Sequence, residues 1–201
     1  MLNNKEKFKL SRKINVDKTV FDIPIIKKQN INLEDKVELI NFTSISKEYE
    51  WKIVHMFCFD KRLETLWNLP SRHINKLKKF RAVLSPDFSA YIDMPQMYIM
   101  WNIYRSRWIG AFWQINGINV IPTITWARPD TYMVCFAGIE QGSIVTISTI
   151  GVLTNKDFFM EGYREMIKRI KPSKIICYGE FIEGMEKEIT IVISYESAFV
   201  K

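Results

Sequence analysis

The chain has 201 residues, of which 47% are hydrophobic, 13% aromatic and 25% charged, as in one packed globular domain and unlike a disordered chain. No run approaches the roughly 18 apolar residues of a transmembrane helix, and residues 1–13 lack the apolar core of a secretory signal. Three cysteines, far apart in apolar runs, indicate free thiols in a reducing compartment and no zinc site. We therefore expect a cytoplasmic protein without a membrane span.

The positive charge is concentrated at one end of the sequence. Lys and Arg number 29 against 22 Asp and Glu, a net charge of +7. Residues 1–80 hold 17 of the basic and 10 of the acidic side chains, whereas residues 81–201 hold 12 of each. A basic segment binds the phosphate backbone of DNA or RNA by releasing counterions. The alternative is that a lysine-rich surface only keeps the protein soluble.

Residues 1–36 are polar and lysine-rich, and we expect a basic N-terminal arm there, either lying over the domain or partly mobile. Residues 37–201 are expected to form a single α/β domain. Apolar runs predict strands over residues 37–42, 53–59, 82–84, 118–124, 144–150, 174–178 and 189–194. Helical spacing predicts helices over residues 63–67, 74–80, 95–115, 130–138 and 157–170. Asp93 is placed to cap the longest helix, and Pro122 predicts that the fourth strand stops near Ile121.

Strands alternate with helices, and the strands are continuous apolar runs. Both features favour a mostly parallel sheet of five to seven strands with helices on both faces. The architecture is either an open three-layer sheet or a short barrel-like variant, because a complete eight-fold barrel usually takes about 250 residues.

In parallel α/β sheets, ligands bind beyond the carboxyl ends of the strands. The residues at those ends include Asp60, Asp87, Trp126 and Glu180. Carboxylates gathered at one edge hold a hard cation, usually Mg²⁺, so Asp60 and Asp87, with Glu180 as a third catalytic candidate, are the expected metal site. Alternatively, the two aspartates form an acid–base pair, or each caps the helix that follows it.

The longest predicted helix carries Arg105 and Arg107, which lie roughly 200° apart around a helix axis and so cannot share one role. Arg105 is the expected phosphate clamp, since a guanidinium binds phosphate through two parallel hydrogen bonds. The full set of expected ligand-binding residues is Ser89, Tyr91, Asn102, Arg105, Arg107, Gln114 and Trp126. The sequence contains no phosphate-binding loop, GxGxxG, HExxH or GxSxG signature.

Several segments in order resemble a family of bacterial, phage and mobile-element proteins known only as a domain of unknown function. They are VHMF running to Asp60, LWN, VLSPDFS with DMP, YRSRWIG, GINVIPTITW, and the later short pieces CF, GI, GS, PS and YG. The resemblance covers about residues 38–180 and implies a phage or mobile-element setting without an assigned activity or cofactor. Phe59 and Ala137 stand where the family pattern tends to have acidic residues.

These observations lead to three hypotheses. The first is a nucleic-acid-associated phage or mobile-element protein with a metal-assisted phosphoryl-transfer, nuclease-like site at the strand ends. The second is a small-molecule enzyme or sensor, for a nucleotide or a sugar, that uses the same cleft. The third is a protein-binding module without enzymatic activity that blocks a host factor.

Overall fold

The computed structural model describes residues 4–152 and 155–195. Its helices are α1 (Asn4–Ser11), α2 (Asp60–Asn68), α3 (Ile74–Leu77), α4 (Gln96–Ile115), α5 (Tyr132–Cys135) and α6 (Lys156–Ile170). Its strands are β1 (Leu39–Asn41), β2 (Ile53–His55), β3 (Ala82–Leu84), β4 (Val120–Ile121), β5 (Ile144–Ser148), β6 (Lys174–Tyr178) and β7 (Thr190–Ile193). Short 3-10 turns cover Phe42–Ser44, Lys47–Tyr49 and Pro129–Thr131. The expected α/β class is confirmed.

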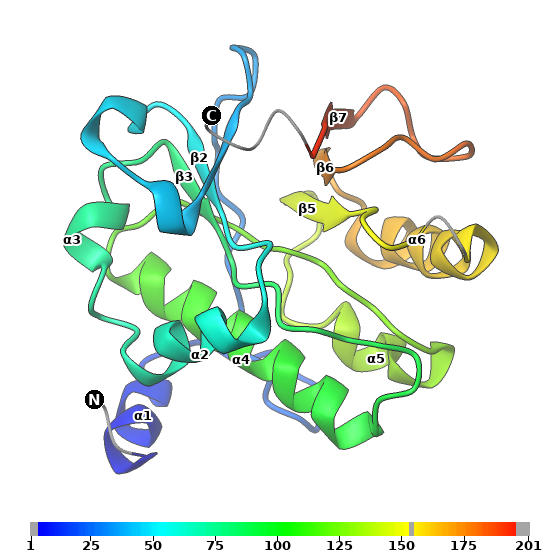
Figure 1. Ribbon diagram of the computed structural model, residues 1–201. Coiled ribbons are helices and arrows are strands. Elements are labelled where there is room, and N and C mark those ends of the chain that lie inside the picture. The colour runs from blue at the N-terminus through cyan, green and yellow to red at the C-terminus, as the bar shows by residue number, and fades with distance from the viewer. Residues whose placement is uncertain (1–3, 153–154, 196–201) are drawn as a thin grey trace.

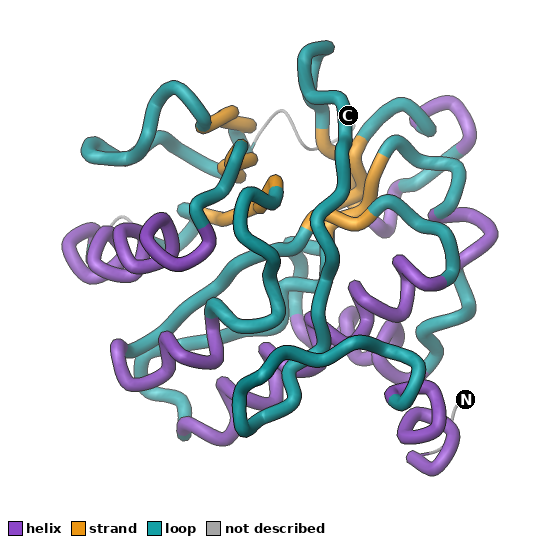
Figure 2. Tube along the Cα trace, turned by 180° about the vertical axis from the view of Figure 1, so that it is seen from behind, coloured by secondary structure: helices purple, strands orange, loops and turns teal. Residues whose placement is uncertain are grey.

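The strands form two sheets in which every pairing is parallel, in the orders β1-β2-β3-β4 and β5-β6-β7 (Figure 2). Between the sheets, the only pairing of the described residues is one bridge from Thr123 to Thr146. Pro122 separates this bridge from the end of β4, and proline has no N–H to continue a ladder. The ladder therefore stops at Ile121, as predicted, and the chain has two sheets at this point instead of one.

The strands other than β7 bury residues on both of their faces, which explains the continuous apolar runs, whereas Val192 of β7 is exposed. In the first sheet, Ile40, Val54 and Val83 lie in register and pack on the helical side. The alternate residues of the strands, among them Ile53 and Ile176, pack into a separate cluster that contains side chains of both sheets and of residues 31–37, and no helical residue. The helices therefore pack against the other face of each sheet, which points away from this cluster.

Aromatic rings connect the two sheets on this inner side. The rings of Phe57 and Tyr178 stack with centroids 4.6 Å apart, and the His55 ring lies 5.1 Å from that of Tyr178. Because β2 and β6 belong to different sheets, these contacts show that the sheets curve toward each other. Within the part of the chain that the structure describes, the result is an open, curved arrangement without a closed barrel, and α1, α2, α4 and α5 lie below the strands in Figure 1.

The long helix α4 packs against both halves of the fold (Figure 1). Ile99 and Ile103 in its first half belong to the core of the second sheet, whereas Trp108 and Trp113 in its second half belong to the core of the first sheet. The predicted Asp93 cap is wrong, because the residue at the N-cap position is Pro95 and no side chain caps the helix. No helix of the described residues is long and apolar enough to cross a membrane.

The N-terminal segment lies over the domain. Ile23 and Ile26 are buried in its two helix-facing cores, and the Trp108 indole N–H donates to the Ser11 hydroxyl at 2.7 Å. The Lys7 side chain of α1 is buried as well, and its ammonium group lies 4.0 Å from the centre of the Trp67 ring. These contacts tie α1 to α2 and α4 and place Lys7 close to the candidate site.

Candidate functional site

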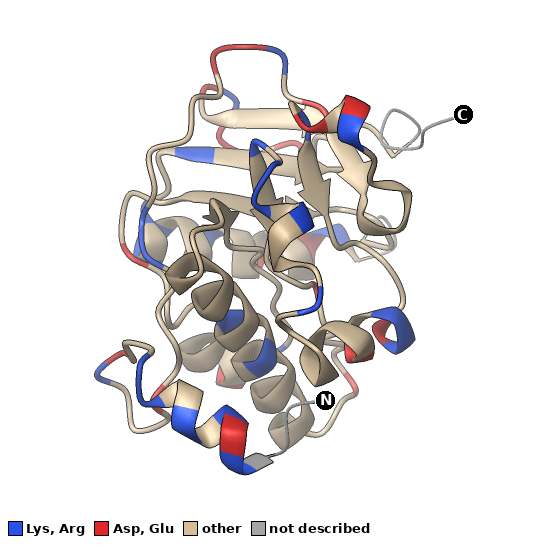
Figure 3. Ribbon diagram, turned by 90° about the vertical axis from the view of Figure 1, so that its left-hand side faces the viewer, with Lys and Arg blue, Asp and Glu red and all other residues tan. Residues whose placement is uncertain are grey.

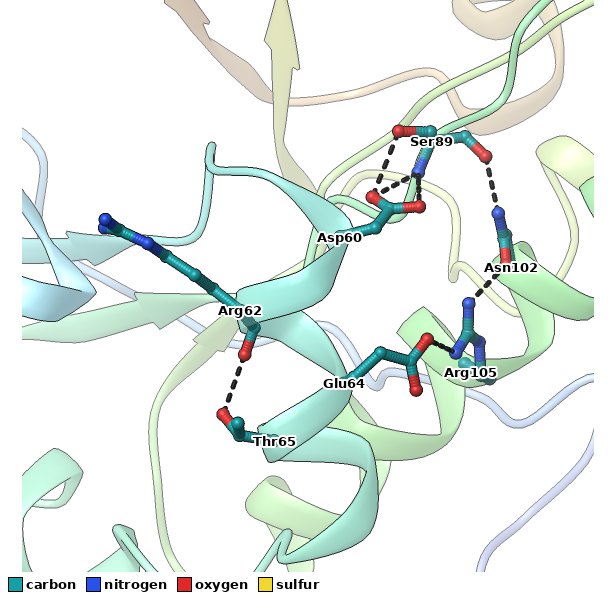
Figure 4. Close-up of polar contacts among 7 residues, drawn as sticks. All are labelled: Asp60, Arg62, Glu64, Thr65, Ser89, Asn102 and Arg105. Carbon is teal, nitrogen blue, oxygen red and sulfur yellow. Dashed lines mark hydrogen bonds and ion pairs between the residues drawn. The ribbon is translucent and has the colours of Figure 1, made fainter.

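The two aspartates predicted to follow neighbouring strands lie at the carboxyl ends of β2 and β3. Asp60 is the first residue of α2, and its Oδ1 accepts two hydrogen bonds from Ser89, one from the backbone N–H at 3.1 Å and one from the hydroxyl at 3.0 Å (Figure 4). The Ser89 hydroxyl also lies 3.1 Å from the hydroxyl of Tyr91. These bonds connect the start of α2 to the loop that follows β3.

A chain of side-chain contacts continues from Ser89 to the long helix. The side-chain amide of Asn102 donates to the backbone carbonyl of Ser89 at 2.7 Å. Arg105 in turn donates to the side-chain oxygen Oδ1 of Asn102 at 2.6 Å. Arg105 also forms an ion pair with Glu64 of α2 (Figure 4). Asn102 and Arg105 are three residues apart on α4, and Asp60 and Glu64 are four apart on α2, so each pair lies on one helix face.

Arg105 is held on several sides. Its guanidinium lies 4.0 Å from the centre of the Phe88 ring, and the side chain is only 7% exposed. The guanidinium also makes the ion pair with Glu64 and the hydrogen bond to Asn102. A cation stacked on a ring and paired with a carboxylate is rigid, so Arg105 organises the site. The predicted phosphate-clamp role would require it to leave Glu64.

Asp87 differs sharply from Asp60. Asp87 is half-buried, and among the described residues its carboxyl group has no hydrogen-bond or ion-pair partner. Desolvation by the surrounding protein, and then the neighbouring negative charge of Asp60, raise the pKa of Asp87 to about 7, whereas Arg107 acts to lower it. A carboxylic acid in such an environment can hold or release a proton near neutral pH.

The Cys58 thiol lies close enough to both aspartates to be affected by their charges. Desolvation, followed by smaller contributions from Asp87 and Asp60, raises the pKa of Cys58 to about 11, against the opposing effect of Arg62. A thiol with this pKa stays protonated at neutral pH and is a poor nucleophile. Cys58 is therefore not an activated thiol.

Arg107 and Gln114, two of the expected ligand-binding residues, make contacts within the fold. Arg107 is fully buried and donates to the backbone carbonyls of Thr123, Cys135 and Ala137. Gln114 exchanges hydrogen bonds with the backbone of Lys27 in the N-terminal segment. These contacts occupy both side chains.

Trp126 packs between the rings of Phe136 and Phe159 in the core of the second sheet. Glu180 is exposed at the end of β6, where its backbone exchanges hydrogen bonds with Thr149. Its charge is not among those that shift the pKa of Asp87. Neither residue joins the Asp60–Asp87 pair.

Within residues 4–152 and 155–195, no three His, Cys, Asp or Glu side chains are grouped closely enough to form a metal cluster. Two pockets lie elsewhere. One, of about 450 Å³, includes Trp51 and Arg81 near the start of β2 and β3, and the other, of about 260 Å³, lies beside the end of α6. Lys and Arg occur on α1 and on several other helices and loops (Figure 3).

Two residues close to this site, Glu64 and Lys7, were not predicted from the sequence. Glu64 completes the contact chain through Arg105, and the helical spacing from Asp60 to Glu64 is the signal that could have found it. Lys7 has a lowered pKa, chiefly because it is buried, and is influenced by the charges of Glu64 and Arg105. No signal in the sequence distinguishes Lys7 from the exposed lysines around it.

The fold and the carboxylate site define an α/β protein whose candidate chemistry lies at the carboxyl ends of parallel strands. Residues 16–196 match the family described as Domain of unknown function (DUF4417), and the chain belongs to that family. This confirms the resemblance seen over residues 38–180 and extends it in both directions.

The relatives of this chain include two phage proteins. It is 46% identical over 145 residues to the Gene 1 protein of Mycobacterium phage L5, a match covering 71% of this chain and 63% of that protein. It is 43% identical over 129 residues to the Gene 1 protein of Mycobacterium phage D29, covering 63% of this chain and 48% of that protein. The matched regions thus span about half to two thirds of these relatives. No solved structure matches the chain.

Proposed function

We propose that this phage-family protein is nucleic-acid-associated and carries out metal-assisted phosphoryl transfer at the Asp60–Asp87 pair. The observation that carries the proposal is the half-buried Asp87 carboxyl, which has no partner among the described residues and is close enough to Asp60 for that carboxylate to raise its pKa. Partial burial of a carboxylate without a partner is unfavourable, and a bound cation would offset that cost.

Mg²⁺ is the cation that suits this pair. It keeps several waters and is commonly bound through one or two carboxylates together with substrate phosphates, so a third protein ligand is not required. Asp60 and Asp87 would hold the ion, which would orient an attacking water and the phosphate. In this hydrolysis the water oxygen would bond to phosphorus and lose a proton to solvent, while the ester P–O bond would break and the leaving oxygen would take up a proton from solvent.

The experiment that tests this proposal measures cleavage of labelled single-stranded DNA, duplex DNA and RNA by the full chain, with Mg²⁺ and with EDTA. We expect Mg²⁺-dependent cleavage that falls more than about 100-fold in Asp87→Asn and in Asp60→Asn, because the metal supplies several kcal/mol. The control is Asp93→Asn, which changes an exposed aspartate of the same chain segment. Cleavage that survives Asp87→Asn and EDTA would overturn the proposal, as would the absence of nucleic-acid binding across a salt series starting at low salt.

A second candidate function is favoured by the pKa of about 7 at Asp87. An acid poised near neutrality suits proton transfer on a small nucleotide or sugar without a metal. Thermal-shift screening with such ligands separates the two functions, because a ligand that binds only the folded state raises its stability. Stabilisation by a small ligand in EDTA, lost in Asp87→Asn, would favour this second function.

A further inference from the structure

Four exposed aromatic residues lie just before α2, in the loop after β3 and in the first half of α4, the segments that carry Asp60, Ser89 and Asn102. We propose that the rings of Phe59, Tyr91, Tyr98 and Trp101 form a stacking surface for unpaired bases, so that the ligand of this site is single-stranded nucleic acid. This inference rests on the proposed function and adds its substrate class. We call these four residues the ring surface.

Phe59 is the most exposed of the four, at 85%, and directly precedes Asp60 at the start of α2. A phenylalanine so exposed adds almost nothing to the hydrophobic stabilisation of the fold. Its position therefore needs another reason than packing. Since it is joined to the residue whose carboxylate holds Ser89, a base stacked on its ring would lie close to the carboxylate pair.

Trp101 is partly exposed and held in one orientation by its neighbours. Its ring lies parallel to that of Tyr104, with centroids 5.8 Å apart, and meets the Trp67 ring edge to face at 5.2 Å. The Arg105 guanidinium is 5.6 Å from its centre. A ring that is fixed on its protein side loses little conformational entropy when a ligand stacks on its open side.

The two tyrosines are placed by the same contact chain. Tyr91 is 61% exposed, and its hydroxyl lies 3.1 Å from that of Ser89. Tyr98 is 63% exposed and precedes Asn102 by one helical turn on α4. Phe59 and Trp101 are thus next in sequence to Asp60 and Asn102. Tyr91 is hydrogen-bonded to Ser89, and Tyr98 lies one helical turn before Asn102.

Unpaired cations accompany the rings. Lys61 and Arg62 follow Asp60 in the first turn of α2, and both are exposed without an ion-pair partner among the described residues. Aromatic faces that stack on bases, together with cations that track phosphates, are the usual means of binding single strands. A duplex hides its base faces, so this surface should discriminate against it. Aromatic rings also bind sugars, but an uncharged sugar would not need the cations.

The test is a binding titration of the full chain, with Ca²⁺ in place of Mg²⁺, against a labelled single strand of about 15 nucleotides and the corresponding duplex. We expect tighter binding of the single strand. Phe59→Ala and Tyr98→Ala should each weaken it about fivefold or more, because stacking contributes roughly 1–3 kcal/mol per base. Phe59→Leu should also weaken it, whereas Phe59→Trp should retain it, since a ring face is required.

Trp51→Ala is the matched control, because Trp51 is 49% exposed but precedes β2, at the end of the strand opposite Phe59. Equal affinity for the duplex, unchanged binding by Phe59→Ala and Tyr98→Ala, or an equal loss in Trp51→Ala would overturn the inference. Single-strand binding through the rings without any cleavage would refute the phosphoryl transfer alone. Asp87-dependent cleavage that is unaffected by Phe59→Ala and Tyr98→Ala would refute the ring surface alone.

Discussion

Ser89 donates both its backbone N–H and its hydroxyl to Oδ1 of Asp60, at 3.1 and 3.0 Å. Asp60 is therefore held by the loop after β3, while the neighbouring Asp87 has no such partner among the described residues. Two carboxyl groups that follow adjacent strands thus have different environments. Different environments push the pKa values of two carboxyl groups apart, which lets one act as an acid while the other stays ionised.

Asp87 should make the stability of the protein depend on pH. Its pKa is about 7 in the folded protein against 3.8 ordinarily, so folding favours the protonated form. This contribution is fully present below about pH 4 and is lost as the pH rises through about 7. Asp87→Asn should therefore raise the melting temperature at pH 8 by a few degrees but change it little at pH 4. Thermal unfolding at both pH values checks this, and an identical pH profile for Asp87→Asn and Asp93→Asn would contradict it.

Removing the charge of Asp60 should lower the pKa of Asp87, because that charge is the second largest cause of the upward shift. Asp60→Asn keeps the size of the side chain and an oxygen that can accept from Ser89. Carboxyl-carbon NMR titration of Asp87 in the two proteins measures the change directly. An unchanged or higher pKa would mean that desolvation alone sets it.

Arg105 and Glu64 should contribute unequally to stability, although they form one ion pair. Arg105→Met leaves Asn102 and Glu64 without their donor and loses the stacking on Phe88, so we expect a loss of about 3 kcal/mol. Glu64→Gln should cost less than about 1 kcal/mol, since the Glu64 side chain is 45% exposed to water. Urea unfolding of both variants gives the two values, and equal losses would be inconsistent with this account.

Replacing Gly162 on α6 by alanine should destabilise the protein, although alanine is more favourable than glycine in a helix by about 1 kcal/mol. A Cβ at this position would overlap the Trp126 ring, and overpacking of this kind costs about 1–3 kcal/mol. We therefore expect Gly162→Ala to destabilise the protein in chemical unfolding. In a Trp126→Leu background the same change should cost nothing or stabilise, and strictly additive effects would argue against the contact.

Gln114 should hold the N-terminal segment in place. Its side chain exchanges hydrogen bonds with the Lys27 backbone and donates to the Gln29 side chain at 2.8 Å. Gln114→Ala should therefore speed trypsin cleavage after Lys27 or Lys28, because local opening exposes the backbone there. Mass spectrometry of the early fragments measures it, with Gln141→Ala on a separate surface loop as the control. Unchanged cleavage rates would show that burial of Ile26 alone anchors this segment.

A prediction from the sequence succeeded where it rested on a pattern of residues close together in the chain. Apolar runs and helical spacing are local, so strands such as 82–84 and helices such as 95–115 agree closely with β3 and α4. The Asp93 cap failed because Pro95, not Asp93, lies directly before the first turn. Asp60 and Asp87 lie at neighbouring strand ends because β2 and β3 pair in parallel, and their role as a metal or catalytic site stays a prediction.

The sequence by itself determined the α/β class, the parallel strands, the concentration of charge in residues 1–80 and the family. These follow from composition, periodicity and the order of residues, which need no knowledge of distant contacts. Only the tertiary structure showed which of the two arginines, Arg105 or Arg107, lies beside the candidate site. Both are buried on one helix, but Arg107 meets three backbone carbonyls and Arg105 meets Glu64 and Asn102. The role of each arginine depends on which distant segment packs against its side of α4, and helical spacing does not contain that information.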